Sequence, residues 1–151
     1  MSGFWPPGPR TVPAPKPVEY DFTGRRVLLV EDHLLNVEVA KRMLESRGMQ
    51  VEVAENGLVA IETFARTPVG YFDAILMDIR MPVMDGLTAT RSIRQMKKPT
   101  AKTIPIIAMS ANAFDEDMER SRVAGMNAHL SKPIEPQTLY ETVARFVPPK
   151  E

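Results

Sequence analysis

Short apolar runs alternate five times along the chain with segments of helical periodicity. The apolar runs lie at residues 27–30, 51–53, 72–77, 104–109 and 127–131. Helical patterns follow them from about residues 35, 57, 87, 113 and 135. Strands that alternate with helices predict a parallel sheet with helices on both faces, because each strand must cross over to reach the next. A run that is entirely apolar, such as residues 27–30, indicates a strand buried on both faces.

Five such units leave few possible topologies, since crossovers between parallel strands are right-handed. The compact α/β arrangement is a flavodoxin-like (βα)5 doubly wound sandwich with strand order 2-1-3-4-5. In this order the first and third strands are neighbours at the topological switch point. We therefore expect a ligand site beyond the carboxyl ends of these strands.

The prolines separate a tail from the predicted domain. Six of the 14 prolines lie within residues 6–17, where they exclude a helix or a central strand. We expect a proline-rich linker or tail at residues 1–23, one folded domain at residues 24–147 and a short C-terminal tail at residues 148–151. The P-x-x-P at residues 6–9 could bind a polyproline-recognition domain, although a plain linker is the favoured interpretation.

Charge and cysteine content exclude several functional classes. Lys plus Arg and Asp plus Glu both number 19, which argues against nonspecific nucleic-acid binding and against direct membrane contact. The chain has no cysteine, so disulfides, thiolate zinc sites and cysteine nucleophiles are excluded. No apolar run approaches the ~18 residues of a membrane span, and the N-terminus lacks a secretory pattern. We therefore expect a cytoplasmic location.

Polar residues follow the predicted strands at their carboxyl ends. They are Glu31, Asp32, Asp78, Ser110 and Lys132. Carboxylates that gather at one rim repel each other by roughly 4 kcal/mol per pair at about 4 Å and an effective dielectric of about 20. A bound cation relieves this repulsion, and oxygen ligands without His or Cys favour Mg²⁺, which Mn²⁺ could replace.

A divalent cation, an ammonium and a hydroxyl around one carboxylate are what phosphoryl transfer to an aspartate requires, because charge spreads over three equatorial oxygens in the transition state. Asp78 would be the nucleophile. Glu31 and Asp32 would hold the metal, whereas Lys132 and Ser110 would contact phosphoryl oxygens. Ordinary alternatives exist for single residues: Asp32 as a helix N-cap, and Asp78 or Ser110 as turn residues.

Four motifs in this order resemble the receiver domains of response regulators and hybrid histidine kinases. They are LLVED, LMDIRMPVMDG, IIAMSANA and HLSKP. Each motif alone is weak evidence, but the ordered set is specific, and the resemblance covers about residues 26–147. It implies a phosphorelay receiver that takes a phosphoryl group from phosphohistidine onto Asp78 and then changes its partner binding. The run GMNAHLSKPI is most similar to receivers of hybrid sensor kinases, in which this domain would belong to the cytoplasmic part.

The resemblance also implies further roles at the metal. Asp32 would bind the metal directly, and Glu31 would reach it at longer range or through water. The backbone carbonyl of Arg80, two residues after the acceptor, would be another ligand.

Other implied roles concern switching and phosphoryl lifetime. Ser110 matches a hydroxyl that moves toward the phosphoryl group, and a cis peptide bond is expected before Pro133. His129 occupies the place of a switching Tyr or Phe, which departs from the family pattern. Arg80 and Ala111 lie where the family tunes the lifetime of the aspartyl phosphate.

The implied partner is a histidine kinase or a four-helix histidine-phosphotransfer domain that docks near the first helix and the acidic rim. The expected core-facing residues of that helix are Leu35, Val39, Met43 and Leu44. The residues off this stripe, expected at the docking surface or on ordinary surface, are Leu34, Asn36 and Val37.

Three alternatives stay open. The chain could be a stand-alone response regulator, or a receiver-like binding module that works without phosphate. A metal-dependent phosphatase is disfavoured, because the second acid such sites commonly place two residues past the nucleophile is Arg80 here. We do not expect a turnover enzyme, beyond the domain's own phosphorylation and dephosphorylation.

Overall fold

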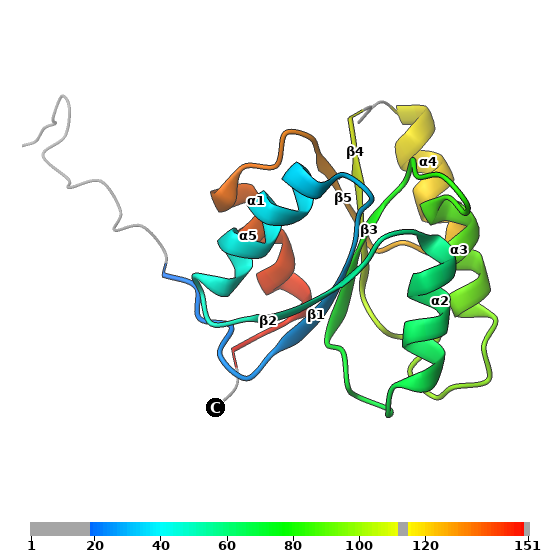
Figure 1. Cartoon of the computed structure of the whole chain (residues 1–151), viewed down its shortest axis with the longest axis horizontal. Helices are drawn as coiled ribbons and strands as arrows, with labels where there is room; N and C mark the ends of the chain where they lie inside the picture. Colours follow the sequence, from blue (N-terminus) through cyan, green and yellow to red (C-terminus); the bar gives the residue numbers. More distant parts are fainter. Residues whose placement is uncertain (1–18, 112–114, 150–151) are drawn as a thin grey trace, which may run out of the picture.

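The computed structural model describes residues 19–111 and 115–149, with five parallel strands between two layers of helices (Figure 1). The strands are β1 (Arg26–Val30), β2 (Gln50–Ala54), β3 (Ala74–Asp78), β4 (Ile106–Ser110) and β5 (Ala128–Ser131). The helices are α1 (Leu34–Glu45), α2 (Gly57–Arg66), α3 (Gly86–Arg94), α4 (Asp115–Ala124) and α5 (Pro136–Phe146). The proline-rich run at residues 6–17 and the expected start of the fourth helix at residue 113 lie outside the described residues.

The sheet has the order β2-β1-β3-β4-β5, which confirms the predicted flavodoxin-like topology. Every strand pair is parallel, and β1 lies between β2 and β3. The strands β3 and β4 each end one residue later than the apolar runs, because Asp78 and Ser110 still pair within the sheet. The carboxyl ends of β1, β3, β4 and β5 therefore lie along one rim.

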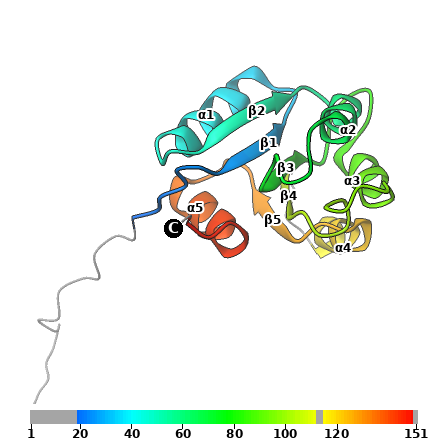
Figure 2. The same cartoon turned by 90° about the horizontal axis from the view of Figure 1, so that it is seen from below.

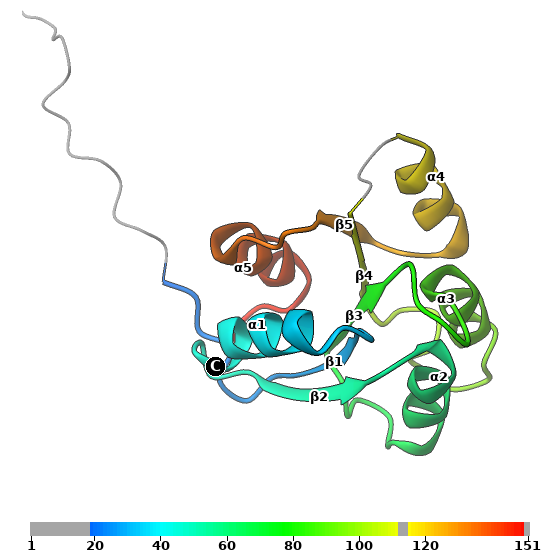
Figure 3. The same ribbon diagram turned by 45° about the horizontal axis from the view of Figure 1, so that its top comes forward.

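Helices α1 and α5 cover one face of the sheet, and α2, α3 and α4 cover the other (Figures 2 and 3). Each face has its own apolar core, because successive strand side chains point to opposite sides. Leu28 and Ile75 belong to the core under α2 and α3, whereas Leu29 and Leu76 belong to the core under α1 and α5. All four side chains are fully buried. Among the described residues, no helix has the length and apolarity that crossing a bilayer requires.

The predicted core face of α1 is wrong in part. Leu35 and Val39 are 70% and 41% exposed, whereas Ala40 and Leu44 are buried and Val37 packs against the core. The buried stripe therefore follows Val37, Ala40 and Leu44, at the spacing of one helix face. Leu35 and Val39 each lie two residues from Val37, which places them roughly 200° around the helix.

The predicted domain boundary at Gly24 also needs correction. Phe22 is 1% exposed and belongs to the core under α1 and α5, and Tyr20 packs against the same core. The backbone N–H of Phe22 donates to the carbonyl of Arg47, at 2.7 Å. The described fold therefore includes residues that the proline-rich composition had assigned to the tail.

Candidate functional site

The rim formed by the carboxyl ends of the strands holds the polar residues that the sequence analysis predicts there. Glu31 and Asp32 directly follow β1, and Asp78 is the last residue of β3. Ser110 is the last residue of β4, and Lys132 directly follows β5, where its backbone N–H donates to the carbonyl of Ser110 at 2.9 Å. Glu31, Asp78 and Ser110 are buried, whereas Asp32 and Lys132 are half-buried.

Three carboxylates meet closely enough to share a cation. One oxygen each of Glu31, Asp32 and Asp78 can be chosen so that all three lie within 4.8 Å of one another. The group contains oxygen ligands only, without nitrogen or sulfur, which suits a hard cation such as Mg²⁺. The donor set therefore fits the metal that the sequence predicts.

Lys132 connects two of these carboxylates. Its Nζ donates to Oε1 of Glu31 at 2.7 Å and lies 3.2 Å from Oδ2 of Asp78. The other oxygen of Glu31, Oε2, accepts the backbone N–H of His33 at 3.1 Å. Both oxygens of this buried carboxylate are thus engaged, and the ammonium lies beside the acceptor candidate. The peptide bond from Lys132 to Pro133 is cis, as predicted.

These contacts raise the pKa of two groups in the cluster and lower the pKa of the third. Burial and the negative charge of Glu31 raise the pKa of Asp78 to about 7, although the Lys132 ammonium opposes the shift. Burial also acts to raise the pKa of Glu31, but hydrogen bonds from Lys132 and from the His33 backbone outweigh it and lower that pKa. Burial disfavours the Lys132 ammonium, yet the two carboxylates more than offset this and raise its pKa. In the absence of metal, Asp78 is therefore the carboxyl that holds a proton most readily.

The sequence profile of the response regulator receiver domain matches residues 27–144, which is most of the chain. The chain belongs to this family. Among curated proteins, it is 36% identical over 154 residues to probable histidine kinase 1 of Oryza sativa subsp. indica, covering 83% of this chain. It is 37% identical over 118 residues to the peroxide stress-activated histidine kinase mak1 of Schizosaccharomyces pombe, covering 78% of this chain. The chain spans only 16% and 7% of the lengths of these two kinases.

Solved receiver structures have the same fold. One is the receiver domain of the sensor histidine kinase PA1611 from Pseudomonas aeruginosa, described with magnesium coordinated in its active-site cleft. It is 40% identical, with a TM-score of 0.75 over 83% of this chain and 98% of that one. Another is the Saccharomyces cerevisiae receiver of Ssk1 in complex with the histidine phosphotransfer protein Ypd1. That match is 25% identical, with a TM-score of 0.74 over 83% of this chain and 90% of that one.

The remaining predicted residues of this receiver domain lie after β3 and β4 and within β5. Arg80 is exposed two residues after the end of β3, and Ala111 is exposed directly after the end of β4. His129 is half-buried in β5 and pairs in register with Ala108 of β4. Arg80 and Ala111 therefore follow the strand ends that form the rim, whereas His129 lies within its strand, three residues before Lys132.

The loop between β3 and α3 contains a glycine that the sequence analysis did not single out. Gly86 begins α3, its backbone N–H donates to the carbonyl of Ile79 at 2.9 Å, and a Cβ there would clash with the backbone oxygen of Asp78. The same loop holds Val83 with a φ of 71°, which is unusual for a β-branched residue. The motif LMDIRMPVMDG includes Gly86, but only the folded chain reveals that it lies against the backbone of the acceptor candidate.

We predict that Gly86→Ala destabilises the receiver by about 2–3 kcal/mol, because the added methyl must displace backbone rather than a flexible side chain. Urea unfolding monitored by circular dichroism measures this change. Gly70→Ala is the matched control: it adds the same methyl in open space at a φ of 80° and should cost only about 1 kcal/mol of strain. If Gly86→Ala lowered the stability no more than Gly70→Ala does, the result would contradict the close approach of Gly86 to the backbone of Asp78.

We also predict a pH-dependent stability difference between the metal-free receiver and its Asp78→Asn variant. Between the ordinary pKa of 3.8 and about 7, folded Asp78 keeps a proton that the unfolded chain releases. The stability of the unsubstituted domain should therefore fall relative to the variant as pH rises through this window, by about 1.4 kcal/mol per unit of pKa shift at most. Urea unfolding in EDTA at pH 4.5 and pH 7.5 tests the sign. A difference that stays constant with pH would show that the Asp78 pKa is not raised.

Exposed apolar side chains surround the α1 end of the rim. Leu34 is 85% exposed, and a shallow pocket between α1 and the segment after β5 is lined by Leu35, Asn36, Val39 and Ile134. Glu31 and Lys132 line the same pocket, so it adjoins the carboxylate cluster. Val37, predicted at this surface, instead packs into the core.

Proposed function

We propose that this receiver accepts a phosphoryl group from phosphohistidine onto Asp78. The observation that carries the proposal is the position of the Asp78 carboxylate, with two further carboxylates within 4.8 Å and an ammonium at 3.2 Å. An Oδ atom of Asp78 forms the new bond to phosphorus while the P–N bond to the donor imidazole breaks. The bonding electron pair returns to the imidazole nitrogen, which then takes up a proton. Asp78 must be ionised to attack.

Glu31, Asp32, Asp78 and the backbone carbonyl of Arg80 would hold Mg²⁺, and Mn²⁺ could replace it. When bound, the ion neutralises negative charge on the carboxylates and on the phosphoryl oxygens. Lys132 supplies a second positive charge, which also stabilises the phosphoryl oxygens. In this proposal its ammonium exchanges part of its contact with the carboxylates for a contact with the phosphoryl group.

The switching part of the proposal involves Ser110, Ala111 and His129. Ser110 is buried at the end of the strand next to Asp78, which suits a hydroxyl that turns toward a phosphoryl oxygen. Small, exposed Ala111 and exposed Arg80 lie where they could influence water access and hence phosphoryl lifetime. His129 takes the position of the family's aromatic switch, and its smaller, polar ring would couple differently to Ser110.

We further propose that the partner is a histidine-phosphotransfer domain that docks on α1 through Leu34, Leu35, Asn36 and Val39, here called the docking surface. Its apolar side chains adjoin the carboxylate cluster, so a docked domain could present its phosphohistidine to Asp78. The Ypd1–Ssk1 complex supports this class of partner. The kinase relatives support a hybrid histidine kinase as the parent protein, which would place this domain in the cytoplasm.

Acetyl phosphate tests the proposal without any partner protein. We expect incubation with acetyl phosphate and Mg²⁺ to add one phosphoryl group, about 80 Da by intact mass spectrometry, and EDTA to prevent it. A chain that gains no phosphoryl group under these conditions would instead be a receiver-like module that works without phosphate.

A further inference from the structure

We propose that residues 20–25, here called the N-terminal clasp, position α1 for partner docking by holding its C-terminal end against α5. The inference rests on the proposed function, since it concerns the same docking surface. It adds that the segment preceding the receiver takes part in setting that surface.

The clasp is joined to α5 by an aromatic cluster. The rings of Tyr20 and Phe22 stack with centroids 6.2 Å apart, and they lie 5.7 Å and 6.4 Å from the ring of Tyr140 in α5. Phe22 and Tyr140 are both buried. Rings at these separations attract each other beyond the effect of burial, so the clasp is a fixed part of the α5 side of the sheet.

Tyr140 and the clasp also hold the end of α1. The Tyr140 hydroxyl donates to the carbonyl of Met43 at 2.8 Å, and the guanidinium carbon of Arg47 lies 5.1 Å from the Tyr140 ring centroid. A Cβ at Gly48 would clash with the side-chain oxygen of Thr23, so the clasp packs directly on the turn that follows α1. The last turn of α1 is therefore held from two directions.

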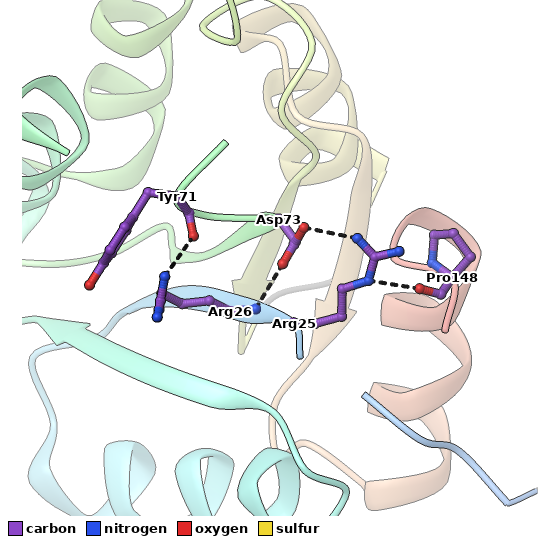
Figure 4. Close-up of polar contacts among 5 residues, drawn as sticks. All are labelled: Arg25, Arg26, Tyr71, Asp73 and Pro148. Atoms are coloured by element: carbon purple, nitrogen blue, oxygen red, sulfur yellow. Dashed lines mark hydrogen bonds and ion pairs between the residues drawn. The ribbon is translucent and has the colours of Figure 1, made fainter. Parts of the chain in front are cut away.

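The other end of the clasp is fixed beside the amino ends of β1 and β3 (Figure 4). Arg25 Nη1 donates to Oδ1 of Asp73 at 3.1 Å, and Arg25 Nε donates to the carbonyl of Pro148 at 2.9 Å. The backbone N–H of Arg26 donates to Oδ2 of Asp73 at 2.8 Å. The chain that leads into β1, the chain that leads into β3 and the chain that leaves α5 thus meet at one carboxylate and one guanidinium.

The geometry of α1 explains why this clasp would affect docking. Ala40 and Leu44 of α1 are buried, and Val37 and Met43 pack against the same core, so the core holds this helix through four side chains, one of them small. A 12-residue helix spans about 18 Å. In the proposal, α1 responds as one unit, so that a change in how its C-terminal end is held shifts Leu34 and Leu35 at its other end.

One variant in the clasp, one variant in its α5 partner Tyr140 and one matched control test this inference on the full chain. Tyr20→Ala removes a half-buried ring, and Tyr140→Phe removes only the hydroxyl bonded to Met43. Tyr71→Phe is the control, because the Tyr71 hydroxyl bonds Glu52 on a different part of the surface. Hydrogen exchange of residues 34–45 reports on α1, and phosphoryl transfer is measured from phosphorylated Ypd1 and, separately, from acetyl phosphate.

We expect both Tyr20→Ala and Tyr140→Phe to exchange α1 amides several-fold faster and to accept the phosphoryl group from Ypd1 about tenfold more slowly, as a loss of preorganised docking would cause. Their rates with acetyl phosphate should stay within about twofold of the unsubstituted chain, because this small donor needs no docking surface. Equal slowing of phosphorylation with both donors, or no slowing with Ypd1, would overturn the inference that the clasp positions α1 for docking. A failure of the proposed function would look different, since the unsubstituted chain would then take no phosphoryl group from acetyl phosphate.

Discussion

Asp78→Asn is expected to abolish phosphorylation of this receiver by acetyl phosphate and Mg²⁺, leaving a folded chain with no mass increase. The amide has nearly the shape of the carboxyl group but lacks the anionic oxygen that must bond phosphorus. Because the other two carboxylates of the cluster, Glu31 and Asp32, are proposed metal ligands, neither should replace Asp78 as acceptor, and the loss should be complete rather than partial. Intact mass spectrometry over a time course measures it, and circular dichroism confirms that the variant is folded.

Asp85→Asn is the matched control for this experiment. Asp85 lies in the loop that follows Asp78 and caps α3. Its side chain accepts the backbone N–H of Thr88 at 2.7 Å, a role that asparagine also performs well. This variant should gain the phosphoryl group at close to the normal rate. Persistent phosphorylation of Asp78→Asn would show that another carboxylate is the acceptor.

Lys132→Ala is expected to reduce the rate of phosphorylation by at least about a hundredfold, the range seen when a preorganised charge at a transition state is removed. It should also destabilise the metal-free domain by about 3–5 kcal/mol, because Glu31 is 2% exposed and loses its cation. Mg²⁺ binding should be retained, since Lys132 is not among the proposed ligands and competes with the ion for the carboxylates. Acetyl phosphate kinetics, urea unfolding and a Mg²⁺ titration of the melting temperature separate these three effects.

Lys98→Ala provides the control for a lysine that is important to the fold but distant from the site. The Lys98 ammonium caps the end of α2 through the carbonyls of Phe64 and Thr67. Its loss should lower stability while leaving phosphorylation rate and Mg²⁺ dependence unchanged. If both lysine variants slowed phosphorylation equally, the effect of Lys132 would reflect general destabilisation.

The sheet and its rim could be predicted from the sequence because their patterns are local. A buried parallel strand requires a continuous apolar run, and a polar residue that ends such a run must lie at the rim. Asp78 and Ser110 end their strands in this way, and Lys132 directly follows β5. The strand order alone brings these residues to one rim, whatever their side-chain contacts.

The face of α1 and the start of the fold could not be predicted in the same way. In α1 the large residues Leu35 and Val39 face outward and small Ala40 faces the sheet, so the residue sizes pointed to the wrong side. Phe22 was assigned to the tail because prolines precede it, yet it packs against residues from the far end of the chain. Gly86 likewise contacts the backbone of Asp78 only after the loop has closed. Each of these features depends on a tertiary contact that local patterns do not specify.

Chemical mapping of the phosphoryl group identifies the residue that carries it. The receiver is phosphorylated with acetyl phosphate and Mg²⁺, treated with borohydride to reduce the acyl phosphate to an alcohol, digested and sequenced by mass spectrometry. We expect the aspartate at position 78 alone to be converted to homoserine, and no conversion in a parallel sample that contains EDTA. Conversion at a different carboxylate, or at position 78 regardless of metal, would contradict the proposal that the carboxylate cluster and Mg²⁺ make Asp78 the phosphoacceptor.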